Sequence, residues 1–246
     1  MHDQSESQFS NNNHNHPIKN HILNSLRKDE FERIKPFLEP ITLVHGKFIF
    51  HPEDPIDYVY FPTEGMISVT SFTEDGRSVE IGTVGKEGMA GIDVILGVDT
   101  TPHESMVQVP GEGFRMKTEA LRREFKQCGV LHDMLLRYTH AFLVQVSQTS
   151  VCNRLHSVDD KLATWLMITR DRVQSDYLHL TQEFIATMLG VNRPTVTTAA
   201  YKLQGEGFIE YRRGKINIIN PKGLEAVACA CYQTVKQEYT SYIGNK

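Results

Sequence analysis

The sequence predicts an α+β fold with an N-terminal β-roll, one long helix and a small C-terminal domain that combines helices with a hairpin. Short runs rich in β-branched and aromatic residues follow one another between residues 41 and 116, separated by Gly and Pro turn signals. Residues 117–156 change to helical spacing, and residues 159–224 continue with short helices and one hairpin. Evenly spaced short strands are typical of a closed barrel or roll, so we expect two domains joined by a helix.

Five segments carry the strand pattern of the expected β-roll. They are residues 41–50, 56–61, 66–72, 78–84 and 105–109. A helical apolar stripe over 18–38 precedes them, and together these elements predict a sensor domain over residues 17–130.

The first residues and the cysteines indicate the compartment. Residues 1–16 are polar and low in complexity, so we expect a disordered tail without a secretory signal. No apolar run is long enough to cross a bilayer, and the four cysteines do not suggest a disulfide framework. We therefore expect a cytoplasmic protein that does not associate with a membrane. Cys229 and Cys231 form a Cys-x-Cys pair, a weak indication of metal or redox chemistry, and small apolar filler is the simpler interpretation. We expect no metal and no cofactor.

The helix after the strands has a heptad-like seam. Leu131, Leu135, Tyr138 and Phe142 follow a 4-3-4 spacing, which indicates an apolar stripe that packs on another helix. The stripe could also pack on its own domain. Its place between two domains favours a dimerisation helix and hinge over residues 131–156.

The segment 180–224 has the pattern of a winged helix-turn-helix. Thr181 can cap a first helix, Gly190 ends it, and Asn192 can cap a second helix that extends to about Leu203. A basic hairpin follows, so we expect a DNA-binding domain over residues 157–225 and a helical extension over residues 226–246.

The candidate DNA contacts lie on the second helix, at the start of the first helix and on the hairpin. They are Thr181, Gln182, Asn192, Arg193, Thr195, Thr197, Thr198, Lys202, Arg212, Arg213 and Lys215. Arg193 can donate two hydrogen bonds to a guanine edge, and the hairpin cations can neutralise phosphates. Residues 159–246 hold eleven Lys and Arg against nine Asp and Glu, although the whole chain has a net charge of −4. This positive surplus permits DNA binding but does not prove it.

On these residues the chain resembles the Crp/Fnr superfamily, the cyclic AMP receptor protein and its relatives. The run from Thr181 to Val196 is similar to the family's DNA-binding signature, and Gly46-Lys47-Phe48 resembles part of its cyclic-nucleotide-binding roll. The resemblance covers about residues 20–225. It implies a homodimer on an inverted-repeat operator, with double-stranded DNA and RNA polymerase as partners. It also implies that Arg193 reads a guanine and that Asn192 and Thr195 hold phosphates, but Pro194 and Thr198 depart from the family pattern and suggest a different operator sequence.

The effector pocket implied by the resemblance departs further from the family. Cyclic-nucleotide binders hold the ribose with a Gly-Glu segment and the phosphate with an Arg-Ser pair. The corresponding residues here are Gly88, Met89, Ala90, Gly91, Ile92, Glu104, Ser105, Val146 and Ser147. Glu104 takes the place of the arginine, and its carboxylate would repel a cyclic phosphate. We therefore expect a sensor that does not bind cyclic AMP, with an unknown apolar or uncharged effector, a partner protein or no effector.

Two other function classes are compatible with parts of the sequence. A cyclic-nucleotide-binding regulatory module without a DNA role would need the β-roll alone, and the basic hairpin and Arg193 argue against it. An enzyme is disfavoured because the chain lacks paired carboxylates or metal ligands at useful spacing. The sequence therefore predicts a transcription regulator with no catalytic residues.

Overall fold

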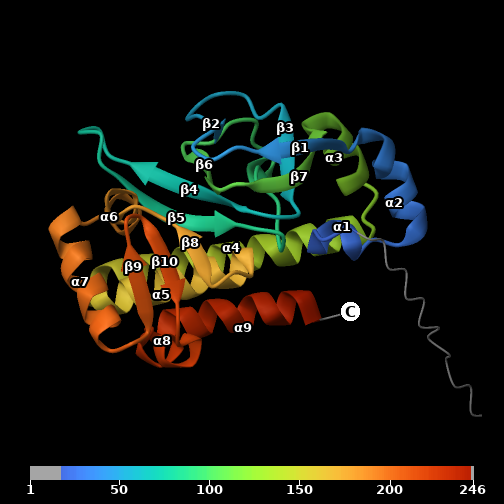
Figure 1. The fold of residues 1–246 in the computed structure, drawn as a ribbon. Helices are drawn as coiled ribbons and strands as arrows, with labels where there is room; N and C mark the ends of the chain where they lie inside the picture. The colour runs from blue at the N-terminus through green and yellow to red at the C-terminus, as the bar shows by residue number, and fades with distance from the viewer. Residues whose placement is uncertain (1–17, 245–246) are drawn as a thin grey trace, which may run out of the picture.

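The structure, a computed structural model, describes residues 18–244 as two hydrophobic cores joined by the long helix α4 (Figure 1). The first core lies in the β-roll and includes parts of α4 and of the last helix, α9. The second core lies in the domain that holds the predicted winged helix-turn-helix. This arrangement confirms the expected α+β fold, while the predicted disordered tail over 1–16 lies outside the described residues.

The β-roll consists of two antiparallel sheets, with strand orders β1-β7-β3 and β2-β6-β4-β5. Its strands are β1 (Glu39–Leu43), β2 (Phe48–Phe50), β3 (Tyr58–Pro62), β4 (Met66–Phe72), β5 (Ser78–Val84), β6 (Glu104–Val109) and β7 (Gly111–Lys117). β4 and β5 match the predicted segments residue for residue, because strong alternation surrounds a turn in which Gly76 has φ +80°. β7 was not predicted. An added Cβ at Gly113 of β7 would lie 2.7 Å from the Phe61 carbonyl oxygen, so the close approach of the two backbones requires glycine here. Glycine is uncommon in strands, and its presence hides the strand pattern in the sequence.

Each of the two helices predicted before and after the strands is divided into shorter helices in the structure. The expected helix over 18–38 is divided into α1 (His21–Asn24), α2 (Lys28–Ile34) and the 3-10 helix η1 (Lys35–Phe37). Asn20 caps α1, and its amide donates to the Pro62 and Gly88 carbonyls, which fixes α1 on the roll. A second 3-10 helix, η2 (Ile92–Leu96), lies between β5 and β6.

The expected helix over 117–156 is also two helices, α3 (Thr118–Phe125) and α4 (Val130–Leu155). Cys128 adopts φ +53° in the connection, and Gly129 precedes α4 in an extended conformation. This left-handed residue interrupts the helical hydrogen bonding, and α4 then continues for 26 residues along the β-roll (Figure 1).

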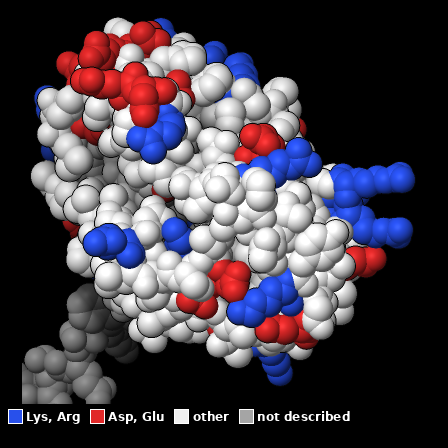
Figure 2. Space-filling view, turned by 90° about the vertical axis from the view of Figure 1, so that its left-hand side faces the viewer, with Lys and Arg blue, Asp and Glu red and all other residues white. Residues whose placement is uncertain are grey.

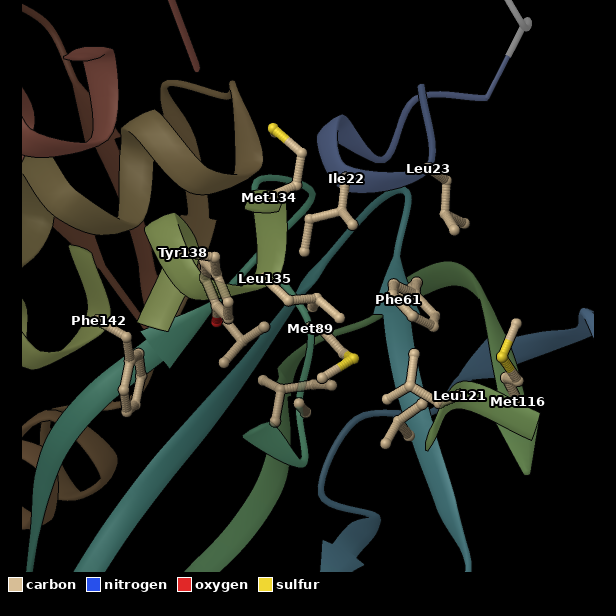
Figure 3. Packing of buried hydrophobic residues seen from close by; sticks show 14 of the residues in the cluster. Ile22, Leu23, Phe61, Met89, Met116, Leu121, Met134, Leu135, Tyr138 and Phe142 are labelled. Atoms are coloured by element: carbon tan, nitrogen blue, oxygen red, sulfur yellow. The ribbon is translucent and has the colours of Figure 1, made fainter. Parts of the chain in front are cut away.

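The four residues predicted for an intersubunit seam belong to the chain's own core. Leu131, Leu135, Tyr138 and Phe142 are all at most 9% exposed and pack in the core of the β-roll. Figure 3 shows Leu135 of α4 beside Met89 of the roll. The seam prediction was wrong because heptad spacing identifies the buried face of a helix but not the element that covers it.

A second apolar stripe of α4 faces solvent. Leu136 and Leu143 are 44% and 57% exposed, and Val151 and Leu155 are 41% and 72% exposed. Leu136 and Leu143 each follow a predicted seam residue by one position, which places them about 100° further around the helix. The exposed stripe is therefore adjacent to the predicted one.

The C-terminal domain has three helices around a small antiparallel sheet of order β8-β10-β9, followed by a fourth, short helix. Its elements are α5 (Val158–Val173), β8 (Tyr177–His179), α6 (Gln182–Leu189), α7 (Arg193–Gly205), β9 (Ile209–Arg212), β10 (Lys215–Ile218) and α8 (Pro221–Val227). The last helix, α9 (Ala230–Gly244), returns along α4, and its Val235, Tyr239 and Tyr242 enter the core of the β-roll (Figure 1). Among the described residues, no helix is both long enough and apolar enough to cross a bilayer.

Candidate nucleic-acid interface and sensor cavity

The helix-turn-helix is formed by α6 and α7. The Thr181 side chain accepts from the Phe184 N–H at 3.1 Å and caps α6, and Gly190 ends that helix with φ +63°. Asn192 caps α7 by accepting from the Thr195 N–H at 3.0 Å. Gly190 and the Asn192 cap fix the turn between the helices, and the Thr181 cap fixes the start of α6, as the sequence pattern predicts.

The start of α7 carries the cation best placed to meet a ligand. Arg193 is the first residue of the helix, and its side chain is exposed. The Thr195 hydroxyl donates to the capping side chain of Asn192 at 2.6 Å, within the first turn of α7. The Thr197 hydroxyl donates to the Gln182 side chain at 2.8 Å and so joins α7 to α6. Thr198 is exposed and also bonds within its own helix. Arg193 is therefore the candidate for direct base recognition on this helix.

The hairpin of β9 and β10 forms a wing beside α7. Its two-residue turn has Arg213 at φ +49° and Gly214 at φ +77°, the conformation that suits a tight hairpin. Arg212, Arg213 and Lys215 are all exposed on this wing. Figure 2 views the molecule from the end that bears α7; Lys and Arg side chains project at its right-hand edge, and Asp and Glu gather at its upper left.

An open hollow of about 500 Å³ lies between the wing and the start of the two helices. Its lining residues are Thr181, Gln182, Glu183, Arg193, Tyr211, Arg213 and Gly214. The structure thus brings four predicted contact residues around one space. Tyr211 was missed because a tyrosine in a strand carries no binding signal. Its hydroxyl donates to the Leu180 carbonyl at 2.7 Å and holds the wing to the segment that leads into α6.

Lys202, predicted to contact DNA, instead forms an ion pair with α5 in the structure. Its ammonium contacts the Asp159 carboxylate of α5 at 2.7 Å. This ion pair lies near the C-terminal end of α7, about two and a half turns from Arg193. Lys202 therefore ties α7 to α5 in this structure, which the helical periodicity could not reveal.

The β-roll contains a cavity of about 220 Å³ closed on one side by α4. Its lining residues are Phe50, Val69, Ile81, Val84, Met89, Ala90, Gly91, Ile92, Asp93, Leu96, Thr101, His103, Ser105, Tyr138, Phe142, Leu143 and Val146. Six residues predicted for the effector pocket are among them, and the wall is mainly apolar. The lining includes no Lys or Arg. Asp93 is the acidic residue among the lining residues.

Three residues predicted for the pocket do not line this cavity. Glu104 is the first residue of β6, next to the lining residue Ser105, and alternation along a strand directs it to the opposite face. Gly88 packs against Tyr138, because an added Cβ would lie 2.2 Å from that ring. Ser147 is exposed. The prediction that Glu104 would repel a phosphate inside the cavity is therefore wrong, because Glu104 does not line it. The lining nevertheless has no cation that could bind a phosphate.

Glu80 of β5 connects the β-roll to the C-terminal domain. Trp165 Nε1 of α5 donates to one of its oxygens at 2.7 Å, and Ser68 Oγ of β4 donates to the other at 2.6 Å. Burial raises the pKa of Glu80 to about 7, although these two hydrogen bonds favour the carboxylate. The two domains therefore meet at a carboxyl group that titrates near neutral pH.

Comparisons with known proteins match both parts of the chain. The cyclic nucleotide-binding domain family matches residues 40–128, and the Crp-like helix-turn-helix domain family matches residues 160–227. A global nitrogen regulator from Synechococcus elongatus is 21% identical over 189 residues, which cover 73% of this chain and 85% of the relative. A global nitrogen regulator from Nostoc is 22% identical over 210 residues, covering 81% of this chain and 93% of the relative.

Solved structures share the fold at low sequence identity. A transcriptional regulator of the Crp/Fnr family from Eubacterium rectale has a TM-score of 0.66 and 18% identity, covering 84% of this chain and 96% of that one. FixK2 from Bradyrhizobium japonicum has a TM-score of 0.68 and 16% identity, covering 78% of this chain and 98% of that one. The β-roll, the long helix and the helix-turn-helix are thus arranged as in these proteins.

Replacing Glu80 with Gln should reduce the pH dependence of the free energy of unfolding. The folded carboxyl has a pKa of about 7, above its ordinary value of 4.5, so the folded chain binds the proton more tightly. The contribution of this carboxyl group to the free energy of unfolding is fully present below about pH 4.5. It is lost as the pH rises through about 7, by about 3 kcal/mol in total. Glutamine stays neutral, can accept from Trp165 and can donate to Ser68.

Urea unfolding at pH 5.5 and pH 8 measures this difference. The wild type should lose more stability than the Glu80→Gln variant between the two pH values. Glu104→Gln, a change at a carboxyl that is only half-buried, serves as the control and should follow the wild type. If Glu80→Gln also followed the wild type, Glu80 would not titrate in this range.

Proposed function

Because the chain belongs to the Crp/Fnr family of transcription regulators, we propose that it binds an inverted-repeat operator as a homodimer and reads one base through Arg193. The observation that carries this proposal is the exposed Arg193 at the start of α7, across a hollow from Arg213 of the wing. A guanidinium at this end of a recognition helix can donate two hydrogen bonds to guanine O6 and N7. The wing cations beside it can hold phosphates and set the register of the helix.

Arg193→Ala should weaken operator binding and relax the preference at one base position. Loss of a bidentate contact costs about 1–3 kcal/mol of discrimination. Lys215→Ala removes a phosphate contact, so it should weaken all DNA sequences alike and reduce the salt dependence. Binding of operator and scrambled duplexes over a range of salt concentrations separates the two effects.

Lys28→Ala is the matched control for these variants. Lys28 is exposed in α2, at the opposite end of the molecule from α7 in Figure 1, so its removal should leave affinity unchanged. An Arg193→Ala protein with wild-type affinity and wild-type preference would contradict the assignment of α7 as the recognition helix.

The exposed stripe of α4 supports the dimer. Leu136, Leu143, Val151 and Leu155 present large apolar side chains to solvent along one long helix. Burial of such a stripe against its copy in a second chain would remove this surface from water and place two α7 helices on one DNA face. We therefore propose this stripe as the dimer contact, with the buried residues Leu135 and Phe142 supporting it from inside.

Leu136→Asp should convert the dimer to monomers and weaken operator binding, because a charge would be buried in an apolar contact. Sedimentation at micromolar concentration measures the assembly. Val98→Asp places the same charge at an exposed valine outside α4 and should leave the dimer intact. A monomeric wild type, or a fully dimeric Leu136→Asp protein, would contradict this assignment.

The lining of the β-roll cavity supports an effector other than a cyclic nucleotide. Burial of a cyclic phosphate needs a cation or several donors, and the described lining offers Asp93 in place of a Lys or Arg. The cavity touches α4 through Tyr138, Phe142, Leu143 and Val146. A small apolar or uncharged molecule bound there would contact the helix that carries the proposed dimer stripe.

Calorimetry with cyclic AMP and cyclic GMP tests the effector class. We expect no binding at micromolar ligand, since the charged phosphate would lose its hydration without a compensating cation. Micromolar binding of either nucleotide, abolished by replacing Ser105 with a bulky residue in the cavity wall, would show that the cavity does accept a cyclic phosphate.

A further inference from the structure

Four metal-ligating side chains meet where α4 ends and α9 begins. Cys152 lies in the last turn of α4, and His156 caps that helix. The Cys-x-Cys pair, expected to be apolar filler, brings Cys229 and Cys231 to the same place from the start of α9. The three sulfur atoms and the closest ring nitrogen of His156 all lie within 4.8 Å of one another.

The distances between these atoms fit a tetrahedral zinc site. Cys152 Sγ and Cys229 Sγ are 3.5 Å apart, and Cys231 Sγ lies 3.6 Å from His156 Nδ1. Zinc binds thiolate sulfur at about 2.3 Å and imidazole nitrogen at about 2.0 Å, which places tetrahedral neighbours about 3.5 to 3.8 Å apart. Two edges of the tetrahedron are therefore already near their final length, and small rotations of the side chains would complete it.

The backbone holds the ligands in pairs. Cys152 and His156 are four residues apart on one helix face, and the His156 N–H donates to the Cys152 carbonyl at 3.2 Å. Thr164 of α5 fixes Cys229, because its hydroxyl accepts from the Cys229 N–H at 3.0 Å. The same hydroxyl lies 3.0 Å from Cys229 Sγ, where it can donate its own proton to a thiolate.

The surroundings suit a site that is closed to solvent. Cys152 and Cys231 are buried, and Cys229 and His156 are half-buried. Three thiolates and one neutral imidazole around Zn²⁺ have a net charge of −1. Lys161, which is 9% exposed, lines a small cavity together with Cys152 and Cys231 and places a positive charge near this group.

A disulfide explains less of this arrangement. A bond between Cys152 and Cys229 would need the sulfur atoms at about 2.05 Å, and the third cysteine and the histidine would have no role. Four donors of the types that zinc prefers, from two separate segments, converge on one point. We propose that Cys152, His156, Cys229 and Cys231 form a Cys₃His site for Zn²⁺.

The position of the site gives the ion a structural role. The ligands Cys152 and His156 immediately precede the C-terminal domain, and Cys229 and Cys231 immediately follow it. One ion would therefore join the two ends of residues 157–228 and hold this domain at a fixed orientation to α4. Removal of zinc or oxidation of the thiols would free both ends together.

The metal content of the full chain tests the proposal. Protein expressed without an affinity tag and purified under reducing conditions should contain one zinc per chain by elemental mass spectrometry. Cys229→Ser/Cys231→Ser should lose nearly all of it. Cys128→Ser changes the remaining, exposed cysteine and should keep the zinc. A variant with His2, His14 and His16 replaced by Ala should also keep it, which separates the site from N-terminal histidines.

A second measurement on the wild type does not depend on how the variants fold. Apo protein titrated with Co²⁺ should develop the strong visible bands of a tetrahedral ion and a thiolate charge-transfer band, saturating at one equivalent. Zn²⁺ should then remove both. A wild type with less than about a tenth of a zinc per chain and no thiolate band with Co²⁺ would overturn the proposal. A Cys152–Cys229 disulfide in protein prepared under reducing conditions, or iron in place of zinc, would overturn it as well.

Discussion

A buried ion pair between the β-roll and the C-terminal domain fixes their relative position. Arg172 of α5 lies 2.9 Å from the Glu87 carboxylate in the loop after β5, and both side chains are less than a tenth exposed. The guanidinium also stacks 4.0 Å from the centre of the Tyr239 ring of α9 and donates to the Gln145 side chain of α4 at 3.4 Å. Four elements therefore meet at one buried charge. Removal of one partner from such a pair costs about 3–5 kcal/mol, so the elements are held together.

The neighbouring groups extend this contact into a network. Glu87 accepts from the Gly85 N–H at 2.8 Å, and Gln145 receives a second hydrogen bond from the Tyr239 hydroxyl at 3.0 Å. Glu80, on the strand that leads to this loop, meets Trp165 of the same helix, α5. The C-terminal domain thus contacts the roll at two buried carboxyl groups. A change in the roll that moves β5 or its loop would change the position of α5, and α5 carries α7 through the Asp159–Lys202 ion pair and shared apolar contacts.

The long helix α4 links the three sites discussed above. One face closes the cavity of the β-roll, a second face presents the exposed leucines, and its last turn carries Cys152 and His156. A molecule in the cavity would touch the helix directly. The proposed zinc ion would hold its end against α9 and against the C-terminal domain. All three sites therefore lie along one helix of 26 residues, which ends at Leu155 just before the C-terminal domain.

Local patterns in the sequence determined the class of the fold and the helix-turn-helix, because caps, left-handed glycines and strand alternation act over a few residues. Thr181, Gly190 and Asn192 occupy the positions that their side chains or backbone require, and β4 and β5 have the expected bounds. Features that need distant partners were decided by the tertiary structure alone. The heptad on α4 showed a buried face but not that the roll and α9 cover it, and Glu104 was placed in the cavity because the strand register was unknown. Cys152 and Cys229 are 77 residues apart, and only the return of α9 along α4 brings their sulfur atoms together. Periodicity and capping act over a few residues and do not determine the distance between residues far apart in the sequence. Packing of the whole chain therefore decided which side chains share a site.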